Sequence, residues 1–507
     1  MLAVLPLLFL QPEASAACAT EDKTGMVIGA YVYRSEMGIP DPALVTHINF
    51  AFAHVNETFD GVYIPDKREL RKVARLGRGR RAPKVLLSIG GWGSGRFSEM
   101  AASPENRRAF AKACRRVVRR FRLDGIDIDW EYPTSNAAGI SASPEDLGNF
   151  TLLMECLRKT LGNKKMLTIA TVCSARYIDF KAVLPYVDYV NVMAYDMGNE
   201  YTYQEAVAAH IAAGVPPRKL VLGMPFHEGQ DVAGTAERCD YIVRHNLRGG
   251  MYWEWNCEQG EHPMAEVCSE KLRVVRSLKN VLVLYEDGGW HKPLTDVLVP
   301  WLDSVAFSHG FAITDSRNTR NVSAEFLDDY DVILQLDCPP YPWPEEAQEA
   351  FMDYIENGKG GYAGFHHATL LGEFDGFPMW DWFSAFMGGI RFDNYIAETC
   401  SGTVKVEDES HPAMRRAGSS FTIDEDEWYT YDKSPREASY IHVIASVDED
   451  SYSPASGVRM GDHPVIWTNT AVKSKNIYFQ FGHSPLLMHN EAFLNILLDT
   501  IDWLSND

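Results

Sequence analysis

The sequence lacks the patterns that mark several large classes of protein. Its nine cysteines form no Cys-x-x-Cys pair, which disfavours a zinc ribbon. The apolar run at residues 2–10 is too short to cross a bilayer, and no other segment approaches a transmembrane length. The 69 aspartates and glutamates outnumber the 48 lysines and arginines, and this net negative charge disfavours nucleic-acid binding. Ordinary glycine and proline contents exclude collagen-like and low-complexity chains.

The 507 residues, 46% of them hydrophobic, are enough for two or three domains with sizeable cores. The charge divides the chain unevenly. Residues 1–266 hold 31 basic and 31 acidic residues, whereas residues 267–507 hold 17 basic and 38 acidic ones. We therefore expect two independently built units joined near residue 267. An uncharged sugar polymer is a ligand compatible with both.

The first residues resemble an export signal. An apolar core is followed by small residues, so we expect a signal peptide over residues 1–17, cleaved after Ala16 or Ala17. A buried N-terminal strand is the alternative interpretation. Cys18 loosely resembles a lipoprotein acceptor site. The expected location is secreted, periplasmic or on the cell surface, with membrane contact only if Cys18 is lipidated. After export, two of Cys239, Cys257 and Cys268 could form a disulfide.

Short apolar, β-branched runs recur eight times in the first unit, mostly separated by helical patterns such as residues 103–121 and 143–161. The predicted strands are residues 26–33, 45–53, 84–90, 125–130, 166–172, 187–195, 219–226 and 249–255. Eight buried strands alternating with helices predict a (β/α)8 TIM barrel over residues 25–266. The chemistry of such barrels lies where the strands end.

The fourth predicted strand carries three acids with a spacing of two. Asp127, Asp129 and Glu131 must point the same way, since strand side chains alternate between faces. In a barrel strand this direction is inward, and closely stacked carboxylates raise the pKa of at least one member. The last acid, Glu131, is then a candidate general acid. A solvated acidic strand edge and a metal site made of three acids are the alternatives.

Residues 124–133, DGIDIDWEYP, resemble the DxxDxDxE signature of glycoside hydrolase family 18, the chitinases and their relatives. Residues 86–92, 191–196 and 250–255 resemble other strand motifs of that family in the right order. The resemblance implies that Glu131 is the general acid and that the substrate's own 2-acetamido group is the nucleophile. It also implies supporting catalytic roles for Asp129, Asp127 and Tyr195. The implied substrate-binding residues are Tyr31, Trp92, Met193, Asp196, His227 and Trp253.

The resemblance favours a chitinase-like enzyme that hydrolyses β-1,4-linked N-acetylglucosamine polymers with retention of configuration. Only residues 227–248 separate the last two strands, where many chitinases carry an insertion, so we expect an open groove and endo-type cutting. His227 departs from the family's usual Tyr and is either a sugar contact or a plain rim residue. The alternative functions are an endo-β-N-acetylglucosaminidase acting on N-glycans or peptidoglycan-type chains, and a non-catalytic chitin-binding lectin.

Strand and helix patterns also alternate in residues 279–507, which predicts an open, mostly parallel α/β sheet. Residues 360–367, 426–429, 463–467 and 482–484 resemble the trehalose-utilisation (ThuA-like) family, a relative of class I glutamine amidotransferases. Those enzymes have a nucleophilic cysteine where this chain has His366, so thiol chemistry is not expected.

Several polar residues of this unit fall at or near predicted strand ends. They form a candidate sugar-handling pocket, namely His291, His366, His367, Glu427, His463 and His483. Purely structural histidines are the alternative interpretation. A metal is a further alternative, since histidines and a carboxylate can form a metal site, but the spacing of these residues is not diagnostic, and we expect neither a metal nor a cofactor. The expected partner is a carbohydrate that contains N-acetylglucosamine.

Overall fold

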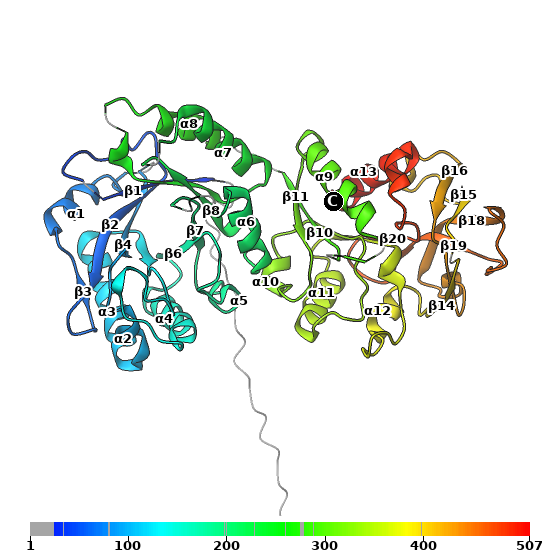
Figure 1. The fold of residues 1–507 in the computed structure, drawn as a ribbon, viewed down its shortest axis with the longest axis horizontal. Coiled ribbons are helices and arrows are strands. Elements are labelled where there is room, and N and C mark those ends of the chain that lie inside the picture. The colour runs from blue at the N-terminus through cyan, green and yellow to red at the C-terminus, as the bar shows by residue number, and fades with distance from the viewer. Residues whose placement is uncertain are drawn as a thin grey trace, which may run out of the picture.

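The computed structural model describes residues 25–506 apart from residues 34, 80–81, 197, 199, 228, 259, 274–277, 287, 290 and 397. A barrel and an open α/β sheet lie side by side along the long axis (Figure 1). The predicted signal peptide and Cys18 fall outside the described residues. Among the helices of the described part, none is long and apolar enough to span a membrane.

The eight predicted barrel strands are all present and all parallel. They are β1 (Val27–Val32), β2 (His47–Val55), β4 (Lys84–Gly90), β5 (Gly125–Asp129), β6 (Met166–Val172), β7 (Tyr189–Met193), β8 (Leu220–Pro225) and β9 (Gly249–Trp253). Neighbours pair in the order β1-β9-β8-β7-β6-β5-β4-β2, and pairing of β1 with β2 closes the ring. A short strand, β3 (Val62–Tyr63), pairs with the end of β2. The predicted TIM barrel is confirmed.

Helices cover the outside of the barrel. They are α1 (Lys67–Val73), α2 (Phe97–Ala102), α3 (Pro104–Phe121), α4 (Asp146–Leu161), α5 (Phe180–Val183), α6 (Tyr203–Ala212), α7 (Val232–Arg244) and α8 (Pro263–Leu272). Ser103 caps α3 as predicted, because its side chain accepts a hydrogen bond from the backbone N–H of Asn106. The helix expected from residue 143 begins instead at Asp146, whose carboxylate accepts hydrogen bonds from the Ser143 backbone and the Ser98 hydroxyl.

The second sheet has nine strands, and its first five are parallel, as predicted. These are β11 (Phe311–Ser316), β10 (Lys279–Leu284), β12 (Val332–Gln335), β13 (Gly361–Phe365) and β20 (Asn476–Phe479). Four antiparallel strands that the sequence did not predict extend it: β19 (Pro464–Asn469), β18 (Ile441–Ser453), β15 (Cys400–Val406) and β16 (Ser420–Asp426). The strands β14 (Phe392–Tyr395) and β17 (Tyr429–Tyr431) form a separate pair.

Helices pack on both faces of this sheet because the buried strands are apolar on both sides. Val281 and Val283 face α9 (Lys292–Ala306) and α13 (Glu491–Ser505). Leu282 and Leu284, on the opposite face of the same strand, share a core with α10 (Ala324–Leu327), α11 (Glu345–Asn357) and α12 (Asp381–Phe386). Each described apolar core cluster lies wholly within the barrel or wholly within the second unit.

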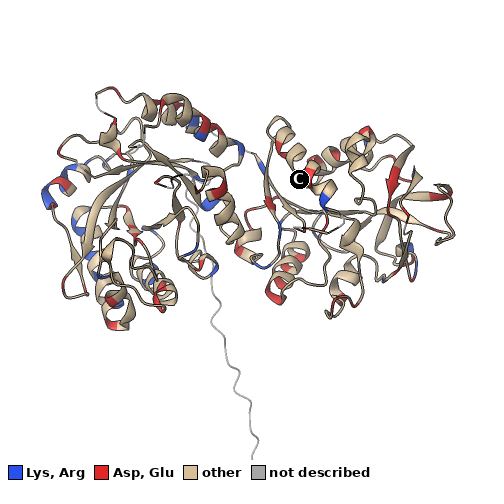
Figure 2. Cartoon of the chain, in the orientation of Figure 1, with Lys and Arg blue, Asp and Glu red and all other residues tan. Residues whose placement is uncertain are grey.

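The contact between the two units is largely polar. Basic residues of the barrel meet acidic residues of the second unit. In the second unit, Asp and Glu positions outnumber Lys and Arg positions (Figure 2). The ion pairs join Lys181 to Glu346, Arg218 to Asp329 and Lys219 to Glu325, and Nδ1 of His245 lies 3.9 Å from Asp303. Burial raises the pKa of Asp329 to about 7, although Arg218 opposes this effect. The acidic excess that the sequence places in the second unit therefore supplies the acidic partners of the barrel's basic residues at this contact.

Candidate functional site

The carboxylate of Asp127 sits inside the barrel and accepts four hydrogen bonds. Its Oδ2 accepts from the hydroxyls of Tyr31 at 2.8 Å and Ser88 at 2.7 Å. Its Oδ1 accepts from the hydroxyl of Thr168 at 2.6 Å and the amide of Asn191 at 3.2 Å. Burial raises the pKa of Asp127, but these four donors oppose that effect. Asp127 is therefore a fixed group whose acceptor positions are all used.

Asp129 and Glu131 follow Asp127 toward the carboxyl end of the strand. Oδ1 of Asp129 is buried and has no hydrogen-bond partner among the described residues. Burial, then Glu131 and then Asp127, raises the pKa of Asp129 well above its usual range. Burial also raises the pKa of Glu131 to about 7; a hydrogen bond from Tyr132 opposes this effect, and the charge of Asp196 adds to it. Glu131 can thus hold a proton near neutral pH.

Gly90 explains how the ends of β4 and β5 approach each other so closely. Its φ is +136°, and a Cβ at this position would lie 1.8 Å from the backbone oxygen of Asp129. Any side chain here would push the acidic strand away. The glycines of residues 86–92 therefore have a steric role beside the carboxylates.

Aromatic residues surround the carboxylates at the end of the barrel. Trp253 stacks on Phe52 with centroids 5.6 Å apart and lies 5.9 Å from the ring of Tyr31, and Met193 packs against the same cluster. Tyr195 is buried in this cluster too. Burial, followed by Asp129 and Glu131, raises the pKa of Tyr195 well above its usual range, so its hydroxyl stays a hydrogen-bond donor.

His227 connects two predicted binding residues. Its Nδ1 donates to the backbone carbonyl of Trp253 at 3.1 Å, because a carbonyl can only accept. The neutral ring then presents an acceptor Nε2, which lies 3.0 Å from Oδ1 of Asp196, and the pair is an ion pair when His227 is protonated. The ring also meets Tyr195 edge-on at 5.4 Å. In its protonated form, His227 therefore links the Trp253 carbonyl to the Asp196 carboxylate.

The two tryptophans near the acidic strand have different surroundings. Trp92 is 66% exposed, with its ring centroid 6.4 Å from that of Tyr132. An exposed indole at the mouth of a barrel can stack on a sugar face. Trp130 is 2% exposed and stacks on Phe97 at 5.3 Å, so it points away from the carboxylates into the helix layer. The residue between Asp129 and Glu131 therefore belongs to the core.

Comparison with known families agrees with this geometry. Residues 26–238 match the family described as glycosyl hydrolases family 18, and residues 280–504 match the family described as trehalose utilisation, ThuA. The chain is a family 18 glycosyl hydrolase domain followed by a ThuA domain. The fold and both resemblances expected from the sequence are confirmed.

Curated relatives match the family 18 domain. The chain is 28% identical to Chitinase A1 of Niallia circulans over 322 residues, which cover 46% of this chain and 46% of that protein. It is 26% identical to Chitotriosidase-1 of Mus musculus over 288 residues, which cover 49% of this chain and 61% of that protein. The chain spans about half the length of the curated relatives it matches.

Solved structures resemble each domain separately. A family 18 N-acetylglucosaminidase from Paenibacillus barengoltzii has 27% identity and a TM-score of 0.46, covering 49% of this chain and 100% of its own. A ThuA-like protein from Bacteroides uniformis has 26% identity and a TM-score of 0.41, covering 45% of this chain and 91% of its own.

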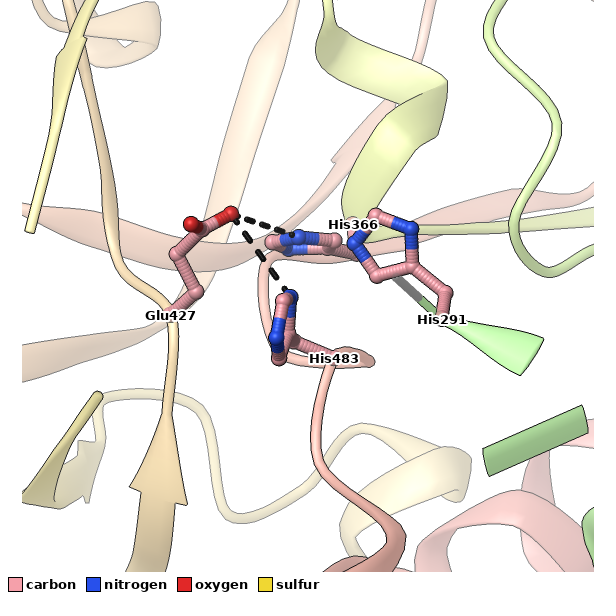
Figure 3. A group of neighbouring side chains, drawn as sticks. All are labelled: His291, His366, Glu427 and His483. Carbon is pink, nitrogen blue, oxygen red and sulfur yellow. Dashed lines mark ion pairs between the residues drawn. The ribbon is translucent and has the colours of Figure 1, made fainter. Parts of the chain in front are cut away.

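In the ThuA domain, five of the six predicted pocket residues come together at the carboxyl ends of the parallel strands. His291, His366, Glu427 and His483 each place one possible ligand atom within 4.8 Å of the others (Figure 3). His367 lies beside them, with its ring centroid 3.9 Å from that of His291. Burial, followed by the neighbouring imidazoles, keeps the pKa of His366 well below its usual range.

The sixth predicted residue, His463, lies outside this cluster, so that prediction is corrected. Its Nδ1 is 2.9 Å from a carboxylate oxygen of Glu449, and its Nε2 is 2.9 Å from the backbone carbonyl of Tyr429. It is buried on the antiparallel side of the sheet, which the sequence did not predict. His463 therefore stabilises strand packing.

Sequence reasoning missed residues that surround the predicted ones. In the barrel these are Ser88, Thr168 and Asn191, which hold Asp127. In the ThuA domain it is Asp337, whose Oδ1 lies 2.7 Å from Nδ1 of His291 and 3.0 Å from Nδ1 of His367. Burial raises the pKa of Asp337, but its two histidine partners lower it to about 2. Asp337 lies just beyond the end of β12, and this position at a strand end was the signal in the sequence that could have identified it.

Proposed function

We propose that this protein hydrolyses β-1,4-linked N-acetylglucosamine polymers, chitin or chito-oligosaccharides, with retention of configuration. The observation that carries the proposal is the inward row of Asp127, Asp129 and Glu131 at the carboxyl end of a family 18 barrel. Family 18 membership itself implies a carbohydrate substrate. The match to chitinases supports the finer assignment.

Glu131 is the proposed general acid. With its pKa raised to about 7, it keeps its proton near neutral pH and can deliver it to the glycosidic oxygen. The same carboxylate then takes a proton from the water that completes hydrolysis. Asp196 adds negative charge nearby and favours the protonated form of Glu131.

The proposed nucleophile is the carbonyl oxygen of the substrate's own acetamido group. Asp129 has a buried Oδ1 without a hydrogen-bond partner in the described residues, so it can accept the acetamido N–H. Tyr195 keeps its hydroxyl proton and can donate to the acetamido oxygen. Asp127 has no unused acceptor position, so its part is to hold negative charge behind Asp129.

Endo-type cutting is the proposed mode. Between β8 and β9 the described residues form one helix, α7, in place of the larger insertion of many chitinases. Two alternative functions must be distinguished from this one by experiment. They are cleavage of N-glycans or peptidoglycan-type chains, and sugar binding without catalysis.

Because chitin is extracellular, we also propose that the chain is exported, in keeping with the predicted signal peptide.

The test compares Glu131→Gln with wild type on a fluorogenic chitobioside. Loss of the acid should slow hydrolysis by about 10²–10⁴-fold while oligosaccharide binding survives. Glu237→Gln is the matched control, because this exposed glutamate of α7 accepts a hydrogen bond from the Tyr203 hydroxyl and has no part in the proposed mechanism. Equal rates for Glu131→Gln and wild type would overturn the assignment.

The substrate is tested on colloidal chitin, fully deacetylated chitosan and a high-mannose glycoprotein. Acetamido participation predicts cleavage of chitin, no cleavage of the deacetylated polymer, and inhibition by a thiazoline mimic of the intermediate. Early release of mixed oligomers supports endo cutting. Release of glycan from the glycoprotein alone would favour the endo-β-N-acetylglucosaminidase alternative.

A further inference from the structure

The histidine cluster of the ThuA domain, defined as His291, His366, Glu427 and His483, has the composition and geometry of a metal site. We propose that it binds one divalent transition-metal ion such as Zn²⁺ or Mn²⁺. The four side chains come from segments after β10, β13, β16 and β20 and point toward one another (Figure 3). The sequence left a metal open only as an alternative, since the spacing of these residues is not diagnostic.

The hydrogen bonding of His366 fixes which ring nitrogen faces the cluster. Its Nδ1 lies 3.0 Å from the backbone carbonyl of Gln480, and a carbonyl can only accept, so Nδ1 carries the hydrogen. In the neutral ring Nε2 then has a free lone pair. This atom is buried, has no hydrogen-bond partner in the described residues, and lies 3.2 Å from Oε2 of Glu427. A lone pair facing a carboxylate oxygen is unfavourable unless a proton or a metal cation lies between them.

His291 is oriented in the same manner by a different group. Its Nδ1 lies 2.7 Å from the carboxylate of Asp337, which leaves Nε2 buried and without a hydrogen-bond partner in the described part of the chain. A carboxylate that holds one nitrogen of a histidine while the other binds metal is the usual supporting arrangement in metal sites. Asp337 is therefore a positioning residue for His291.

His483 completes the arrangement. Its Nδ1 is buried, lacks a hydrogen-bond partner among the described residues, and lies 3.7 Å from Oε2 of Glu427. Gly482 precedes it with a φ of +152°, and a Cβ there would lie 3.1 Å from the Cβ of His366. The glycine thus lets the ends of β13 and β20 come close enough for both imidazoles to reach one point.

His463 shows how a structural histidine of the same domain differs. Both of its ring nitrogens have partners, at 2.9 Å from Glu449 and 2.9 Å from the Tyr429 carbonyl. In the cluster, three imidazoles each keep a buried nitrogen without one. Buried polar atoms normally have hydrogen-bond partners, so several unpaired atoms converging on one point indicate a missing ligand.

The donor set selects the class of ion. Three imidazoles and one carboxylate suit zinc, manganese, iron or cobalt, whereas magnesium and calcium prefer oxygen ligands alone. The carboxylates of Glu427 and Asp337 supply the negative charge that a divalent cation balances. His291 and His366 are 4% and 0% exposed, but the side chains of His483 and Glu427 are 22% and 14% exposed. Solvent therefore reaches the ion from the His483 side, leaving a position for water or a hydroxylated ligand.

The experiment titrates Zn²⁺ and Co²⁺ into the chelator-treated full-length protein. We expect one ion per chain by calorimetry and elemental analysis, and a Co²⁺ visible absorption spectrum. The double variant Glu427→Gln/His483→Gln should bind at least about 100-fold more weakly, and Asp337→Asn about 10–100-fold more weakly. His442→Gln is the matched control, because this exposed histidine of the same domain pairs with Asp408 away from the cluster.

Wild-type protein that binds neither ion, or a folded double variant that binds like wild type, would overturn the proposal. A measurement without variants guards against misfolding of the mutants. Zn²⁺ should protect His483 from diethylpyrocarbonate, as read by mass spectrometry, while exposed His442 stays reactive. Equal modification of both histidines in the presence of Zn²⁺ would also overturn it. Chitobioside hydrolysis by the barrel should not change when the metal is removed, which keeps this test separate from that of the hydrolase.

Discussion

The barrel and the ThuA domain both gather their polar residues at the carboxyl ends of parallel strands, but they do so differently. The barrel takes its acids from one short segment, with Asp127 and Asp129 in β5 and Glu131 two residues beyond its end. The ThuA domain takes its four cluster residues from four separate segments. The first kind of site is visible as a short motif, whereas the second exists only after the sheet has formed. Each can therefore be disrupted without the other.

The largest expected effect is on the acids of the barrel. Asp129→Asn keeps the size of the side chain but removes the carboxyl group that can ionise as positive charge develops beside it, so kcat on a chitobioside should fall by about 10²–10³-fold. Glu427→Gln in the ThuA domain should leave kcat unchanged. Both rates are measured on the same substrate by fluorophore release. A comparable loss in the two variants would mean that the two sites act together.

The donors around Asp127 should matter for stability. Thr168→Val is nearly isosteric and removes the 2.6 Å hydrogen bond to a buried carboxylate. The free energy of unfolding should fall by about 1.5–3 kcal/mol, the usual contribution of a hydrogen bond to a charged group. Urea denaturation followed by tryptophan fluorescence measures it. Thr430→Val offers a comparison in the ThuA domain, where the hydroxyl makes a 3.3 Å bond to a neutral carbonyl and a smaller loss is expected.

The pH profile should report the neighbours of Glu131. The acid form is active, so kcat/KM should decline as the pH rises through about 7. Asp196→Asn removes a charge that raises the pKa of Glu131 and should move this decline to lower pH. Tyr132→Phe removes a hydrogen bond that lowers the pKa and should move it to higher pH.

His227→Gln is the control for these shifts. It removes the ring next to Asp196 but keeps the Asp196 carboxylate, so the decline should stay closer to that of wild type. Shifts of the same sign in Asp196→Asn and Tyr132→Phe would contradict the assignment of Glu131 as the titrating acid.

The smallest expected effect follows removal of the ThuA domain. The two cores are separate and the contact between them is largely polar, so a protein ending at residue 278 should stay folded. Its rate on small chito-oligosaccharides should stay within about twofold of the full chain, as for independent domains. Circular dichroism checks the fold. Loss of this activity in a folded barrel would show that the ThuA domain completes the site.

The barrel could be predicted from the sequence because each strand and the acidic motif are marked by patterns within a few consecutive residues. Eight apolar runs gave eight strands, and the spacing of two placed three carboxylates on one face. The neutral partners Ser88, Thr168 and Asn191 could not be predicted, because each becomes important only through register with a strand elsewhere in the chain. A motif also does not tell which of its residues face the site. Trp130 lies within the acidic signature, but its side chain packs in the core.

The ThuA domain was predicted less completely for the same physical reason. Predicted strand ends pointed to His291, His366, His367 and His483, and the ThuA-like motif at residues 426–429 pointed to Glu427. Nothing local revealed that four of these five residues meet at one point. His463 was misplaced because the antiparallel strands around it were not predicted. Its buried partners lie far away in the sequence, at Glu449 and Tyr429.

The four hydrogen bonds of Asp127 also bear on how the barrel folds. Their donors come from β1, β4, β6 and β7, on both sides of β5 around the ring. The hydrogen bonds that hold Asp127 are therefore completed only when distant strands have joined, not when each strand forms. During refolding, we expect the rate of hydrolysis to recover later than the secondary structure. The time course of this recovery would then report when the barrel closes.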